Sequence, residues 1–362
     1  MKRLWCTQVL AIVRLEMRKT FFSRRGLWVY LLALAPVLLF TGHSIFAPAQ
    51  RDRLKRIAAE HPISSETLGA IRVGMTRDEV VKKLGQPYYQ WRGHDPDEDD
   101  KRSGRAHCRY TDGKTDVDFV FEDGNLIQVD RNDLDAPSQN SRIPQIFAGV
   151  FQSYYLRLAI FFGCVGIFVN LFRGEMLDKS LHFYLLTPIR REVLLAGKYA
   201  AGLLATVVIF TTSTALQWLV LFRGFDRAAV AGYLAGTGWG QLSAYLVVTA
   251  LACVGYGSVF LAVGLLFRNP IIPTAVVLVW EGINAFLPAA LKKISMIYYL
   301  QSLCPVGVIP DRDVPPLVRL LILPTQPATR TTAVLCILLL ALAVLLMAAR
   351  LSRRLEINYS TD

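Results

Sequence analysis

The side chains best suited to chemistry lie in a charged segment, residues 173–198, between two long apolar runs. Because the runs at 146–172 and 200–222 each approach the length of a membrane span, the segment returns to one membrane face without crossing it. Charged groups exposed at such a turn can form ion pairs with a second protein. The residues expected to make this contact are Glu175, Lys179, Ser180, Leu181, Leu185, Pro188, Arg190 and Arg191.

Local patterning predicts a short helix inside this segment. Leu177, Leu181 and Leu185 recur at helical spacing, and Pro188 ends the pattern because proline cannot continue a helix. We expect a partner subunit to bind this helix. An amphipathic helix that merely lies on lipid is the alternative.

Two ionisable residues, Arg157 and Glu281, fall inside apolar runs. Charges are costly in hydrocarbon, so such groups tend to face a bundle interior or a wet cavity. A long arginine side chain could reach a carboxylate at a different depth, and it could equally extend to the external interface. The sequence leaves open whether Arg157 pairs with Glu281.

Composition identifies the class of protein that positions these groups. The chain of 362 residues is 53% hydrophobic with a mean hydropathy of +0.36, which exceeds the values of soluble domains. We expect an all-α polytopic membrane protein with six transmembrane helices plus a small external α+β domain. The predicted spans are residues 27–46, 146–172, 200–222, 242–267, 271–290 and 332–349.

Basic residues predict the orientation of these spans. The short flanks on the N-terminal side are richer in Lys and Arg than the opposite loops, so both termini are expected in the cytosol. The net charge of +12 then reflects topology, and nucleic acid is not needed to explain it. Residues 1–26 should form an interfacial helix, with Trp5, Val9, Ile12 and Val13 opposite Arg14 and Arg18, and 351–362 a cytosolic tail.

Residues 51–142 differ in composition, with 16 basic and 18 acidic residues, and predict a separate domain on the external face. Thr76 and Glu79 form a capping box at the start of a helix that Gly85 ends. Strands are expected at 107–110, 115–121 and 125–130, joined by turns at Asp112-Gly113 and Asp123-Gly124.

The sequence contains none of the common catalytic or cofactor-binding motifs. The sequence has no G-x-x-x-x-G-K-[ST] loop, so any ATPase activity must come from another subunit. Its histidines and cysteines show no metal-ligand spacing, and no nucleophile lies in a recognisable set with a base. We therefore expect a chain that is not an enzyme and holds no cofactor or metal of its own.

The segment at 173–198 resembles the cytosolic loop between the second and third spans of ABC transporter permeases of the type-2 exporter class. The matching features are Glu175, the Ser180-Leu181 pair, the stretch 185–190 and Gly197-Lys198. The resemblance implies a dimer, homo- or heteromeric, that works with a separate ATPase subunit, which binds the ATP and Mg. It also implies an elbow helix before the first span and a re-entrant segment, here at 302–327.

The insertion resembles the BamE (SmpA/OmlA) family of small envelope lipoproteins over residues 65–131. The shared string runs from Val73-Gly74-Met75-Thr76 to Leu84-Gly85-Gln86-Pro87 and continues into two hairpins. No lipid-bearing cysteine precedes it, so flanking spans would replace the anchor. The family implies a helix-on-sheet module that binds other envelope proteins; a small spacer with no partner is the alternative.

Together these resemblances predict a permease in the inner membrane of a bacterium, with residues 51–142 in the periplasm. It would export a substrate by alternating access, driven by the ATPase. The alternative is a non-transporting assembly in which the conformational change driven by the ATPase is passed to the external domain, for signalling or envelope assembly. A membrane-bound enzyme is disfavoured by the missing catalytic set.

Overall fold

The computed structural model describes residues 2–22, 26–92, 105–135, 142–177, 190–223, 225–267, 269–307 and 326–352. These residues are mostly helical and include one four-stranded sheet. The contacts divide the chain into two compact units. Unit 1 comprises Met1–Leu38, Phe147–Trp218 and Gly240–Asp362, and unit 2 comprises Leu39–Ile146 and Leu219–Trp239.

Long apolar helices indicate a membrane-embedded protein. Among the described residues, five helices are long and apolar enough to cross a membrane. Three of them are single helices, α2 (Leu27–Glu60), α9 (Arg191–Leu221) and α16 (Arg330–Ser352). The run Pro144–Gly174 extends from within α5 (Arg142–Val150) through α6 (Phe161–Cys164) into α7 (Asn170–Leu177), and the run Arg227–Leu266 contains α10 (Arg227–Tyr233) and α11 (Trp239–Leu266).

The predicted span at 271–290 is not one long helix. It begins as α12 (Ile271–Gly282), whose 12 residues extend about 18 Å and so fall short of the ~30 Å of hydrocarbon. A short 3₁₀ turn, α13 (Ala289–Lys292) and α14 (Met296–Leu303) follow. Six spanning helices therefore stay a prediction, and most of the expected re-entrant segment, 308–325, lies outside the described residues.

Helix α2 extends well beyond the predicted end of the first span at residue 46. It continues through Pro48 to Glu60 because the following residues, rich in Arg, Leu, Lys and Ala, favour helix. Its 34 residues extend about 51 Å, roughly 20 Å more than a hydrocarbon core requires. Residues 51–60, expected to belong to the external domain alone, are thus the last turns of this helix.

Aromatic side chains fill much of the core of unit 1. Phe147 packs with its ring centroid 5.0 Å from that of Trp218 and 4.8 Å from that of Tyr245. The ring of Phe151 lies 4.7 Å from the same tyrosine ring. These contacts join α5, α9 and α11, and all four side chains are buried.

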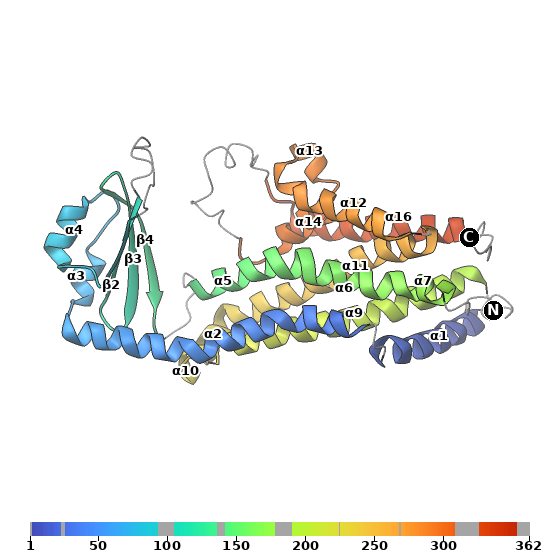
Figure 1. Cartoon of the computed structure of the whole chain (residues 1–362), viewed down its shortest axis with the longest axis horizontal. Coiled ribbons are helices and arrows are strands. Elements are labelled where there is room, and N and C mark those ends of the chain that lie inside the picture. Colours follow the sequence, from blue (N-terminus) through green and yellow to red (C-terminus); the bar gives the residue numbers. More distant parts are fainter. Residues whose placement is uncertain are drawn as a thin grey trace. The chain divides into compact units, whose positions relative to one another are not determined.

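Unit 2 contains a four-stranded antiparallel sheet in the order β1-β2-β3-β4. The strands are β1 (Tyr89–Arg92), β2 (Arg105–Thr111), β3 (Thr115–Glu122) and β4 (Asn125–Asp133). Two short helices, α3 (Ser65–Gly69) and α4 (Arg77–Leu84), lie beside the sheet (Figure 1). Alternate strand residues such as Val117, Phe119 and Phe121 form a buried core with Leu68 and Val80 of these helices.

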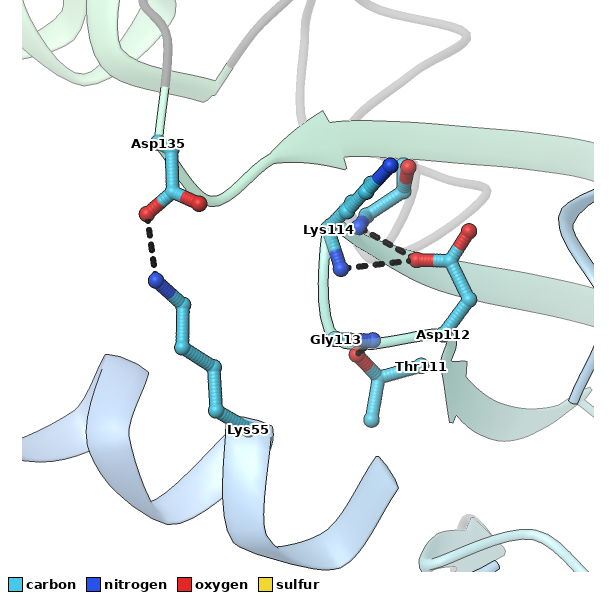
Figure 2. A network of polar contacts seen from close by, with 7 residues as sticks. Lys55, Thr111, Asp112, Gly113, Lys114 and Asp135 are labelled. Carbon is cyan, nitrogen blue, oxygen red and sulfur yellow. Dashed lines mark hydrogen bonds and ion pairs between the residues drawn. The ribbon is translucent and has the colours of Figure 1, made fainter. Parts of the chain in front are cut away.

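Local signals in unit 2 are confirmed. The Thr76 hydroxyl accepts from the Glu79 backbone, the Glu79 carboxylate accepts from the Thr76 backbone, and Gly85 ends α4 with a φ of 82°. Figure 2 shows the turn between β2 and β3, where the Asp112 carboxylate accepts from the backbone N–H groups of Lys114 and Thr115. Strand β1 and helix α3 were not predicted.

The sheet is also tied to α2. An ion pair of 2.8 Å joins Lys55 Nζ to Asp135 Oδ1 just after β4, as Figure 2 shows. Gly113, with a φ of 84°, lies so close to α2 that a Cβ there would be 3.2 Å from the Cβ of Ala58. The end of α2 is therefore part of the folded unit rather than a loose tether.

Candidate functional site

The charged segment predicted to bind a partner begins at the end of α7 and finishes at the start of α9. Glu175 belongs to α7, although its side chain is not among those described. Lys179, Ser180, Leu181, Leu185 and Pro188 lie outside the described residues. What the structure describes is therefore how the two ends of the segment are held.

A buried ion pair anchors one end. Lys198 Nζ of α9 lies 2.7 Å from Glu16 Oε1 of α1 (Lys2–Phe22) and donates to the Leu171 carbonyl of α7 at 2.8 Å. The lysine side chain is 0% exposed and the glutamate side chain 4% exposed. Burying either charge alone would be costly, because water cannot hydrate it, and the ion pair offsets part of that cost.

Close packing brings the helices of this pair together. A Cβ added to Gly197 would lie 2.9 Å from Cγ2 of Ile12, so only glycine allows α1 to approach α9 this closely. The Lys198 ammonium also lies 5.3 Å from the centre of the Phe172 ring, a cation–π contact. We call the set Ile12, Glu16, Leu171, Gly197 and Lys198 the α1–α9 junction.

The two arginines predicted to meet the partner both make contacts within unit 1. Arg190 is exposed, with its guanidinium 5.0 Å from the centre of the Trp5 ring of α1. Arg191 Nη1 donates to the Ser352 carbonyl at the end of α16, at 3.0 Å. Figure 1 shows α1 and the end of α16 at the same end of the bundle. The α9 end of the segment is thus linked to α1 and α16, the first and last described helices.

Glu281 is a helix cap. Its buried carboxylate accepts from the backbone N–H groups of Met296 at 3.1 Å and Ile297 at 2.9 Å, the first residues of α14. The Ser295 hydroxyl at 2.8 Å and the Tyr256 hydroxyl at 3.3 Å complete its coordination. The carboxylate thereby satisfies donors that a helix N-terminus leaves open.

No ion pair links Arg157 to Glu281 among the described residues. Arg157 is half-buried and lies in a π-helical stretch, Phe151–Ile160, of the second long helix. Such stretches are rare and occur often at functional sites. The pairing considered from the sequence is therefore not formed, although both charged groups interact with Tyr256, whose hydroxyl donates to Glu281.

Glu16 is the residue of the junction that sequence reasoning missed. The apolar face expected on the first helix, with Ile12 at its centre, also contains Glu16 one turn later. Ile12 and Glu16 are buried, whereas Trp5 is 39% exposed. An acidic residue on the apolar face of an interfacial helix was the available signal, and it indicates a buried basic partner.

No candidate metal centre exists in the part of the chain that the structure describes, because no three His, Cys, Asp or Glu side chains gather there. In comparisons with known proteins, no family model, no curated protein and no solved structure matches this chain.

Proposed function

We propose that this chain is the permease subunit of an ATP-binding-cassette transporter of the type-2 exporter class. It works as a dimer in the inner membrane of a bacterium, with both termini cytosolic and the sheet-bearing unit in the periplasm. A separate ATPase subunit binds ATP and Mg and docks on the segment between α7 and α9. The observation that supports the proposal most is the α1–α9 junction.

The junction gives the docking segment mechanical connections. Lys198 holds α9 to α1 and α7 through Glu16 and the Leu171 carbonyl, and Arg191 holds α9 to α16. A push by the ATPase on residues 178–189 is therefore passed to four helices at once. Closure of the ATPase would tilt these helices between two arrangements and release substrate outward.

A second function is favoured by the length of α2. This single helix runs from Leu27 through the apolar stretch to Glu60, beside the sheet of unit 2. A push on the membrane helices could be carried along it to an external module that binds envelope proteins through residues 65–131. The protein would then transmit force or a signal without transporting a substrate.

The docking proposal is tested by purifying the chain from its native membrane and measuring ATP hydrolysis by the ATPase that accompanies it. Arg190→Ala with Arg191→Ala should reduce both association and stimulated hydrolysis. The matched control is Arg223→Ala with Arg227→Ala, which removes two exposed arginines near the predicted external end of α9. Equal association and hydrolysis in both double variants would refute docking at this segment.

Transport is separated from force transmission by reconstitution. The chain and its ATPase are placed in sealed vesicles, and ATP-dependent movement of amphiphiles, peptides and drugs is followed together with hydrolysis. Flux that stops with the Arg190 and Arg191 variant supports an exporter. Hydrolysis that depends on these arginines without any flux supports the transmission function.

A further inference from the structure

Arg157 is a charged side chain near the middle of the apolar run Pro144–Gly174. Arginine keeps its charge in proteins, so it cannot avoid the cost of hydrocarbon by giving up a proton. Its guanidinium therefore needs an anion or water at this depth. The group that supplies the anion decides what this residue does.

The intramembrane carboxylate of Glu281 is committed to other donors. Its two oxygens accept from the Ser295 hydroxyl, the Tyr256 hydroxyl and the first two backbone N–H groups of α14. The charge of Arg157 acts on the same tyrosine hydroxyl, which donates to Glu281. Among the residues that the structure describes, none accepts a hydrogen bond from the Arg157 guanidinium.

The guanidinium is also open to an incoming group. Arg157 is half-buried, and none of its nitrogen atoms is closed off from the surface. Ser153, about one helical turn earlier, is exposed, and so is Leu158, which follows the arginine. Leu156 and Ala159, in contrast, are completely buried. The charge thus lies at the edge of the exposed face of this helix, with a hydroxyl donor and an apolar side chain beside it.

The backbone around Arg157 is held in place from its buried side. The arginine lies within the π-helical stretch Phe151–Ile160. In this stretch the Tyr155 hydroxyl donates to a carbonyl of α9 at 2.7 Å, and the Gln152 amide donates to the Val306 carbonyl at 2.8 Å. Sites built on a positioned helix hold a ligand more precisely than sites on loops. The stretch can therefore present Arg157 to a ligand in a defined place.

We propose that Arg157, together with Ser153, binds the anionic headgroup of an amphiphile, a phosphate or a carboxylate. This amphiphile is the exported substrate, an assignment that rests on the proposed function. The N–H donors of a guanidinium match the oxygens of either group, and the Ser153 hydroxyl adds one donor. The hydrocarbon tail lies along the exposed apolar surface at Leu158. A neutral amphiphile would leave the guanidinium without an anion.

Binding is tested with probes that share one hydrocarbon chain and differ in the headgroup. The full chain, purified in a non-ionic detergent and freed of lipid, is titrated with dodecyl phosphate, dodecanoate and dodecanol, and native mass spectrometry records the molecules bound per chain. Each anionic probe should bind about tenfold more tightly than dodecanol, the effect of one charge-assisted hydrogen bond. Equal affinity for all three probes would overturn the proposal.

Free anions distinguish an amphiphile from a soluble ligand of the same chemistry. Inorganic phosphate should compete with dodecyl phosphate, and acetate with dodecanoate, at affinities lower by about tenfold or more, because neither carries the apolar tail. Competition at equal affinity would overturn the assignment to an amphiphile.

Matched variants locate the site. Arg157→Gln should remove the preference for the anionic probes, and Arg157→Lys, which keeps the charge, should retain most of it. The control is Arg173→Gln, at a half-buried arginine near the other end of the same apolar run, which should leave the preference unchanged. An equal effect of Arg157→Gln and Arg173→Gln would overturn the site. Should Arg157→Gln fail to fold, Ser153→Ala decides, because it should weaken the anionic probes roughly threefold and leave dodecanol unchanged.

Flux distinguishes an exported substrate from a lipid that merely resides on the helix. In sealed vesicles that contain the chain and its ATPase, Arg157→Gln should lower ATP-dependent movement of the anionic probes about tenfold or more, while the ATPase stays associated. Unchanged flux in this variant, or no movement of either anionic probe by the unaltered chain, would overturn the assignment of the amphiphile as substrate. Failure of any ATPase to accompany the unaltered chain would refute the proposed function instead, and the titration would still decide the binding site.

Discussion

A buried lysine and a buried glutamate, such as Lys198 and Glu16, depend on each other for their charge. Both side chains are buried, and Lys198 also donates to the Leu171 carbonyl and lies near the Phe172 ring. Such a pair adds little to stability compared with well-packed apolar residues, but removing one partner alone is strongly destabilising. The pair therefore contributes to the specificity of the contact between α1 and α9 more than to stability.

Lys198→Met should consequently lower the free energy of unfolding by about 3–5 kcal/mol, because the buried Glu16 carboxylate loses the ammonium 2.7 Å away. Adding Glu16→Leu should restore much of the loss. Chemical unfolding of the purified chain in detergent measures both variants. Lys293→Met, at an exposed lysine, is the control and should have little effect. A double variant less stable than the single one would contradict the interpretation of the pair.

Asp112 offers a residue-scale test that depends on pH. Burial raises the pKa of Asp112. Hydrogen bonds from the Ser65 hydroxyl and from the backbone of Thr115 and Lys114 together lower it by more, so the net pKa falls below the ordinary value of 3.8. A carboxylate with a depressed folded-state pKa stabilises the fold above pH 3.8. That contribution is lost as the pH falls through the folded-state pKa.

Residues 51–135, which keep the last turns of α2, should give a soluble domain that unfolds cooperatively when expressed alone, since α3, α4 and the sheet share one core and Lys55 of α2 pairs with Asp135. In this domain Asp112→Asn should cost about 0.5–1 kcal/mol at pH 7, because solvent screens a partly exposed carboxylate, and the difference should shrink as the pH falls below 3.8. Urea unfolding across this pH range measures it. A difference that persists unchanged at low pH would show that the carboxylate charge is not what stabilises the turn.

At the scale of elements, predictions succeed where the signal is local. Thr76 and Glu79 are three residues apart, so the start of α4 can be predicted from the sequence and is confirmed. The turn residues Asp112-Gly113 and Asp123-Gly124 are equally local, and they correctly separate β2, β3 and β4. Strand β1 has no such signal, since it is defined by its pairing with β2 and not by a turn next to it.

Contacts between distant elements explain what the sequence left open. Lys198 and Glu16 are 182 positions apart, and neither residue's surroundings specify the other. Glu281 could be recognised as an unusual carboxylate in an apolar run. Its partners at Ser295, Met296 and Ile297 become visible only when the chain folds back after α12.

The capping role of Glu281 leads to an element-scale prediction. Ser295, the residue before α14, makes no side-chain cap of its own, so the start of this helix depends on Glu281. Glu281→Leu should lower stability by about 1–3 kcal/mol and expose the amides of Met296 and Ile297, because buried donors lose their acceptor. Hydrogen exchange measured by mass spectrometry reports the amides directly.

Two milder changes serve as controls for that effect. Glu281→Gln keeps one acceptor oxygen and should protect the α14 amides better than Glu281→Leu does. Tyr256→Phe removes one of the four donors and leaves the backbone caps intact. Full protection of the Met296 and Ile297 amides in Glu281→Leu would mean that the carboxylate does not hold the helix start.

At the scale of the whole molecule, apolar content predicts membrane embedding but not the number of crossings. The segment at 271–290 has the hydropathy of a span, yet α12 ends at Gly282 and the chain turns back. Hydropathy cannot detect this, because a helix that ends part-way through an apolar stretch and one that crosses the membrane are equally apolar. Orientation depends instead on the excess of Lys and Arg on one side, which is a property of the loops.

This orientation is tested by labelling single cysteines in intact cells after the six native cysteines are replaced. Lys82→Cys, on the exposed face of α4, should react with an impermeant thiol reagent, whereas Arg14→Cys, on the exposed side of α1, should react only after detergent opens the membrane. Both positions are exposed, so the difference reports sidedness and not burial. Reversed labelling would put α4 and the sheet in the cytosol and remove the docking segment from the reach of an ATPase. Labelling of both cysteines in intact cells would show that the count of basic residues does not set the topology of this chain.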